Sequence, residues 1–138
     1  MEIELDSSAY KRSNSSRVDE AIAKLHVYPS ADFLEFYKAY EGPFSSEKTG
    51  FELLDICEPS DNSIVSSTIM CRDQYELPRQ FLVVSNYLGN SVLVYDTESD
   101  KIYNMDFEGG DELVKLNKLE PQFRSFGSFL GWYFQGKR

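Results

Sequence analysis

The stretch Phe81-Leu82-Val83-Val84-Ser85-Asn86-Tyr87-Leu88, followed by Gly89-Asn90 and then by Ser91-Val92-Leu93-Val94-Tyr95, decides the fold. Two runs that suit β-strands flank a two-residue loop, and glycine in that loop tolerates the positive φ angle of a tight turn. This pattern predicts an antiparallel hairpin. A second, acidic turn over 96–100 leads into an alternating segment, 101–107, so the three strands are expected to form a meander.

The segments on either side of this meander differ in the spacing of their apolar residues. Apolar residues at helical spacing predict one helix from Arg17 to about His26 and a second from Pro29-Ser30 to about Tyr40. Residues 51–56 alternate as a further strand does. Residues 63–75 suit either a helix or an irregular crossing, and we favour a helix.

The end of the chain carries the last helical pattern, because Phe126, Phe129 and Tyr133 recur at spacings of three and four after the capping residue Ser125. The expected fold is therefore α+β. An antiparallel sheet of about four strands forms a meander, with N-terminal and C-terminal helices packed against one side of it.

The 138 residues suit one domain, with a polar leader over 1–15 and a single domain over 16–138. The chain opens with acidic residues where a secretory signal would be basic and then apolar, and its longest apolar run is Phe81 to Val84. Such a run is far below the ~20 residues of a membrane span. A cytoplasmic location without membrane attachment is expected.

Negative charge is concentrated in two central segments, 47–76 and 96–112. Each segment holds seven of the 23 acidic residues, and together they contain three of the 14 basic ones, in a chain of net charge −9. The rest of the sequence therefore carries nine acids and eleven bases. Such a field repels phosphate backbones, which argues against nucleic acid and favours a basic protein partner. Simple solubility is the alternative explanation.

Several weak motifs occur in a characteristic order. They are Tyr28-Pro29, Phe33, Phe36-Tyr37 and Glu41-Gly42 around one helix, then Phe51-Glu52-Leu53-Leu54-Asp55-Ile56, Phe81-Leu82-Val83-Val84, Tyr95-Asp96 and Ser125-Phe126-Gly127-Ser128-Phe129-Leu130. In these motifs the sequence is similar to the SUKH superfamily, which includes bacterial immunity proteins against polymorphic toxins and fungal regulators of cell-wall glucan synthesis. The resemblance covers about 18–134 and implies an antiparallel sheet with packed helices and a face that binds a partner, without a cofactor or a catalytic group.

Residues that could perform catalysis are sparse. His26 is the single histidine and stands beside core-like residues, so a capping or half-buried role is favoured over a general base. Cys57 and Cys71 lack the paired spacing of structural zinc sites and are expected to be partly buried thiols. The segment 96–100 begins like a calcium loop, but Lys101 replaces the required glycine, so an acidic turn is the better interpretation.

An enzymatic alternative rests on Gly109-Gly110-Asp111-Glu112-Leu113, which looks like the signature of diguanylate cyclases. In this alternative, Asp55 and the carboxylates of Asp111 and Glu112 would hold the metal ion of a metal-dependent nucleotide enzyme. The residues after Asp55 lack the second acid and the helix signature of that family, so a chance match is favoured.

The leading hypothesis is a non-enzymatic protein-binding module without metal or cofactor. We expect an immunity protein that neutralises a basic toxin, possibly a nuclease, through an acidic surface. A regulator or scaffold similar to the glucan synthesis regulators is the alternative. The expected partner contacts are Asp55, Glu58, Asp61, Asp96, Glu98 and Asp106.

Overall fold

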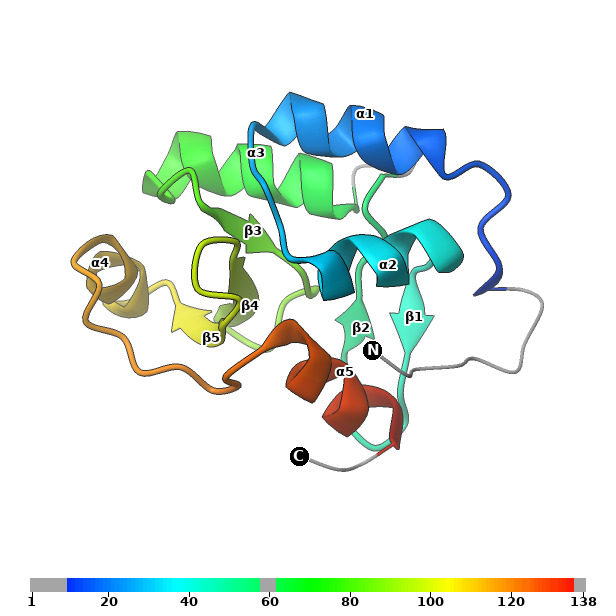
Figure 1. Cartoon of the computed structure of the whole chain (residues 1–138). Helices are drawn as coiled ribbons and strands as arrows, with labels where there is room; N and C mark the ends of the chain where they lie inside the picture. Colours follow the sequence, from blue (N-terminus) through cyan, green and yellow to red (C-terminus); the bar gives the residue numbers. More distant parts are fainter. Residues whose placement is uncertain (1–9, 58–61, 136–138) are drawn as a thin grey trace.

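The computed structural model describes residues 10–57 and 62–135, which form five helices and two small antiparallel sheets (Figure 1). The mixed α+β class is confirmed. The helices are α1 (Ser16–Leu25), α2 (Ala31–Ala39), α3 (Ile64–Tyr75), α4 (Gly110–Lys115) and α5 (Phe126–Gln135). The strands are β1 (Phe44–Ser45), β2 (Glu52–Leu53), β3 (Phe81–Val83), β4 (Ser91–Asp96) and β5 (Ile102–Asp106).

The predicted meander is present as the three-stranded sheet β3-β4-β5. Val83 pairs with Val94, and Val94 pairs in turn with Tyr103, in antiparallel register. The prediction of one four-stranded sheet is wrong, because β2 pairs with β1 in a separate two-stranded sheet. The segment after β3 meets β2 through an isolated bridge between Leu53 and Ser85. The bridge extends no further as a ladder, since the Asn86 side chain accepts the Glu52 N–H.

The three-stranded sheet is covered on both faces, whereas the sequence predicted cover on one. Successive side chains of a strand point to opposite faces. Here each set enters a different apolar core. A large core contains Leu82, Val84, Leu93, Tyr95 and Ile102 from this sheet, with residues of α1, α2, β1, β2 and α5. A small core contains Phe81, Val83, Val92, Val94, Tyr103 and Met105, with Cys71, Leu77 and Val114.

Helix α3 resolves the ambiguous segment and protects an edge of the sheet. Ser63 and Ser66 form a capping box at its start, which satisfies backbone donors of the first turn. Farther along, the Thr68 hydroxyl accepts the N–H of Val83 at 2.9 Å. This bond pairs a backbone donor that an edge strand would otherwise leave open, so α3 closes one side of β3-β4-β5.

The capping role expected for Ser125 is confirmed, since Ser125 accepts the Ser128 N–H before α5. Ser30, which the sequence placed at the start of the second helix, accepts the Phe33 N–H and caps α2. Helix α4 and strand β1 were not predicted. Figure 1 places α4 at one end of the molecule and the β1–β2 hairpin toward the other.

Candidate functional site

Asp55 is not a surface contact, which corrects the prediction made for it. Its side chain is buried and pairs with the Arg12 guanidinium, and it also accepts the Gly42 N–H at 3.0 Å. Burial raises the pKa of this carboxyl, while Gly42 and Arg12 act in the opposite direction. Arg12 belongs to the predicted leader, so the described part of that leader is anchored to the domain.

Asp96 is also buried, and its carboxylate organises the turn between β4 and β5. It accepts the Glu98 N–H and the Ser99 hydroxyl, each at 2.9 Å. The acidic hairpin turn expected for 96–100 is therefore present, and Asp96 is removed from the candidate surface. Glu98 is exposed and lines a pocket of about 480 Å³ with His26 and Arg79. Glu58 and Asp61 lie outside the described residues.

Asp106 is exposed and belongs to the second acidic segment. The two segments meet beside it, because Tyr75, next to Glu76, contacts Phe107, next to Asp106. Glu108 precedes α4, and Asp111 and Glu112 lie in its first turn. Lys115 joins the two segments, because its Nζ lies 3.1 Å from Glu112 Oε1 and 3.6 Å from Glu76 Oε1. We call this surface the acidic end. It consists of Glu76, Asp106, Glu108, Asp111, Glu112 and Lys115, together with Tyr75, Tyr87 and Phe107.

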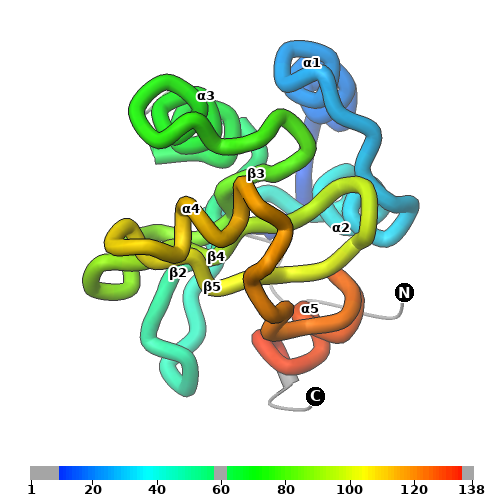
Figure 2. The backbone as a smooth tube through the Cα atoms, turned by 90° about the vertical axis from the view of Figure 1, so that its left-hand side faces the viewer, coloured from blue at the N-terminus to red at the C-terminus, as the bar shows by residue number. Residues whose placement is uncertain are grey.

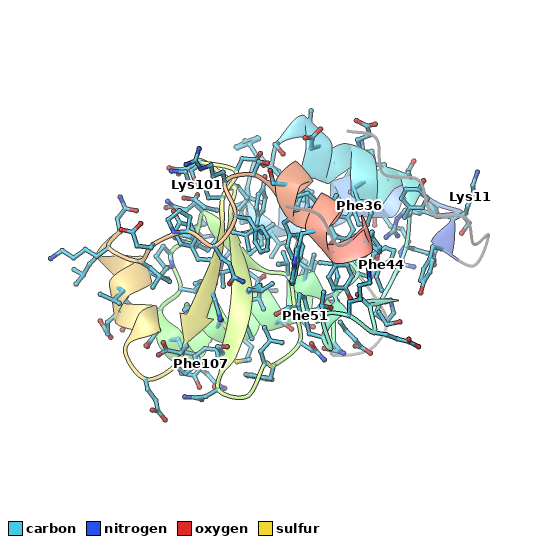
Figure 3. The ribbon with its side chains drawn as sticks, turned by 90° about the horizontal axis from the view of Figure 1, so that it is seen from below. Lys11, Phe36, Phe44, Phe51, Lys101 and Phe107 are labelled. Atoms are coloured by element: carbon cyan, nitrogen blue, oxygen red, sulfur yellow. The ribbon has the colours of Figure 1, made fainter. Side chains whose placement is uncertain are left out.

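Three aromatic rings lie together at the acidic end without being fully covered. The rings of Tyr75 and Phe107 have centroids 4.4 Å apart, and Tyr87 lies 5.9 Å from Phe107. Tyr87 is 56% exposed, and the other two are partly buried beside the small core. Phe107 lies at the opposite end of the molecule from Lys11, far from Phe36 and Phe44 (Figure 3). Leu116 of the neighbouring loop is 60% exposed.

The shape of the acidic end is fixed by backbone contacts of Asp106. Its carboxylate accepts the N–H groups of Glu108 at 2.9 Å and Gly110 at 3.0 Å. These bonds, led by that of Gly110, lower the pKa of Asp106 and keep it ionised. Gly109 has φ +131°, which disfavours other residues, and a Cβ on Gly110 would lie 3.1 Å from the Asp106 carboxylate. The two glycines that suggested a cyclase signature therefore have a structural use.

The described residues offer little for metal or nucleophilic chemistry. Within 10–57 and 62–135, no group of three or more histidine, cysteine or acidic side chains is arranged to hold a metal ion. Asp55 is engaged by Arg12 and does not join Asp111 and Glu112 in such a group. Burial raises the pKa of the Cys71 thiol to about 11, which keeps it protonated at neutral pH.

Two further grooves are present, and neither is lined by a residue of the acidic end. The larger, about 610 Å³, lies between α1 and α3, whose axes Figure 2 shows side by side, and Ala21, Val65 and Ile69 contribute apolar lining. The smaller, about 250 Å³, surrounds Arg12 and Asp55 and is mostly polar. Arg12 and Asp55 already satisfy each other there, so this polar groove is a structural feature of the anchored leader.

Of the partner contacts predicted from the sequence, Asp106 lies at the acidic end, and the other acids of that surface were not selected. Glu76, Glu108, Asp111 and Glu112 were counted in the acidic segments without being selected, because nothing in the linear order shows that 76 and 112 meet at Lys115. The alternation of 101–107 did contain a signal for Phe107, as a ring near the end of a strand with acids on both sides.

Comparison with known proteins adds no family: no family model matches the chain, and no curated protein matches it. The helices in the described part of the chain are all too short or too polar to cross a membrane.

Proposed function

We propose that the protein is a non-enzymatic binding module that uses the acidic end to bind a basic polypeptide. The observation that carries this proposal is the combination of incompletely covered rings with an excess of negative charge. Tyr75, Tyr87 and Phe107 offer apolar area, and the acidic end that contains them holds five carboxylates and the ammonium group of Lys115. Aromatic anchors inside a charged rim are typical of protein interfaces.

Charge complementarity selects the kind of occupant. Lysine and arginine side chains of a partner would be attracted by the carboxylates, which accelerates association and weakens binding as salt rises. A second copy of this chain is a poor occupant, because its net charge of −9 repels the same surface. Neutralisation of a basic toxin, such as a nuclease whose cationic groups hold phosphate, is the role that fits this chemistry.

The binding surface is tested by comparing two triple variants of equal charge. Glu76→Gln/Glu108→Gln/Glu112→Gln neutralises the acidic end, and Glu20→Gln/Glu35→Gln/Glu47→Gln neutralises three exposed acids elsewhere. Fluorescence anisotropy with a labelled deca-arginine peptide measures the affinity of each. We expect the first variant to bind roughly tenfold more weakly and the second to differ little from wild type. Equal weakening in both would reduce the effect to net charge and remove this surface from the proposal.

The biological role is tested in cells. Expression of the chain should protect cells that express a basic toxin encoded by a neighbouring gene, and the triple variant of the acidic end should lose that protection. A deletion phenotype in the absence of any toxin would instead support a regulator or scaffold. Protection that survives the triple variant would contradict the assignment of the surface.

A further inference from the structure

Lys115 is the basic residue of the acidic end and contacts acids from two separate elements. Glu76 is the residue that caps the C-terminus of α3, and Glu112 lies one turn before Lys115 in α4. The side chain of Lys115 is 24% exposed, whereas those of Glu76 and Glu112 are 85% and 65% exposed. The Lys115 side chain is therefore more covered along its length than the side chains of the two glutamates, which stay open to solvent.

The geometry points to Lys115 as a built-in competitor that a partner's arginine displaces from between Glu76 and Glu112. This inference rests on the proposed function and adds the side-chain chemistry of the partner. A lysine contact between exposed groups is weak and is carried on a flexible stem, so the ammonium can swing into solvent at little cost. An arginine that enters can bind both carboxylates with its planar fork.

The same arrangement predicts that the surface prefers an arginine of the partner to a lysine. An incoming lysine presents the same ammonium group that Lys115 already supplies, so the exchange gains little. An incoming guanidinium has five donors in a fixed fork and makes paired bonds that an ammonium group cannot make. The resident lysine thus lowers affinity for all basic segments but penalises lysine-rich ones most. It also limits the repulsion between Glu76 and Glu112 while no partner is bound.

Three residues at position 115 test the displacement directly, with deca-arginine as the probe at fixed low salt. Lys115→Gln removes the competitor and is expected to tighten binding about two- to fivefold. Lys115→Arg installs a stronger competitor and is expected to weaken binding, although it conserves charge. Lys118 is the matched control, since it is an exposed lysine just beyond α4, outside the two ion pairs that Lys115 makes. Lys118→Gln and Lys118→Arg should change the affinity less than their counterparts at 115.

The outcomes separate this inference from the proposed function. If wild type binds and the affinities follow the order Gln, Lys, Arg at position 115, the displacement holds. If wild type binds but Lys115→Gln is weaker than wild type, or equals Lys118→Gln, Lys115 is no competitor and the inference is overturned alone. If wild type fails to bind deca-arginine, the proposed function fails and the inference fails with it. Urea midpoints of all variants establish that they are folded.

Discussion

The large core and the small core lie against opposite faces of β3-β4-β5, and a ring at the centre of the first is covered more completely than two rings at the edge of the second. In the large core, Phe126 is fully buried and its ring lies 4.9 Å from Phe33 and 5.2 Å from Tyr95. The small core ends in Phe107 and Tyr75, which pack on each other and remain partly exposed. The centre of the large core is therefore sealed, whereas one edge of the small core is open at the acidic end.

This difference suggests that rings in the centre of the large core and rings at the acidic end contribute differently to stability and to the proposed binding. Closed packing of rings gives most of the apolar stabilisation, because it removes the largest area from water. Rings that are half covered contribute less to folding, and under the proposed function their fixed position would lower the cost of ordering them on binding. We expect mutations in the large core to affect stability and mutations at the acidic end to affect binding.

The largest expected effect comes from the same substitution made in both regions. Phe126→Ala should lower the free energy of unfolding by about 3–5 kcal/mol, as deletion of a buried ring does. Phe107→Ala removes a partly exposed ring and should cost about 1–2 kcal/mol. Urea titration followed by circular dichroism measures both.

Binding should show the reverse order. Phe107→Ala is expected to weaken deca-arginine binding, whereas folded Phe126→Ala, measured well below its unfolding temperature, should bind like wild type. Equal losses of stability in the two variants would contradict the contrast between the buried ring of Phe126 and the partly exposed ring of Phe107.

A second comparison uses two buried hydroxyl groups, one for each region. Tyr133 links α5 to the two-stranded sheet β1-β2. Its hydroxyl accepts the Leu53 N–H at 3.2 Å and donates to the Phe51 carbonyl at 2.7 Å. Burial raises its pKa to about 12, so the hydroxyl keeps its proton. Thr68 accepts one backbone N–H, that of Val83, at the edge of the main sheet.

Tyr133→Phe should cost about 2–3 kcal/mol, because a backbone donor and an acceptor both lose their partner. Thr68→Val keeps the volume and leaves a single donor unpaired, so a cost of about 1–2 kcal/mol is expected. Hydrogen exchange of the Leu53 and Val83 amides checks the assignment, since each should exchange faster in its own variant alone. A loss of protection at both amides in either variant would show that the two regions unfold together.

Local sequence signals predicted most of the main sheet and its helices. The glycine loop at 89–90 and the capping residue Ser125 act within a few residues, so their consequences can be derived from the order of the chain. The pairing of β1 with β2 could not be derived in this way, because a two-residue strand such as Phe44–Ser45 is too short to show an alternation of apolar and polar residues. One four-stranded sheet was expected for that reason.

The candidate site was harder to predict than the fold, and Asp55 shows why. A carboxylate in an acidic segment reads as surface charge unless its counter-ion is known. Its partner Arg12 lies 43 residues earlier, in a segment that looked like a loose leader. Asp96 misled in the same way, since it serves the backbone of its own turn. Charge counts predicted that an acidic surface exists, but tertiary contacts decide which acids form it.

The smallest expected effect concerns Asp106, which connects the small core to the acidic end. The N–H groups of Gly110 and Glu108 lower its pKa in the folded chain, so the stability it contributes is present above the unfolded pKa of about 4. That contribution is lost as the pH falls through the lower, folded pKa. Asp106→Asn should therefore lower the urea midpoint at pH 7, and the difference from wild type should narrow steadily below pH 4. A difference that stays constant from pH 7 to pH 2.5 would mean that Asp106 acts through the shape of its turn and not through its charge.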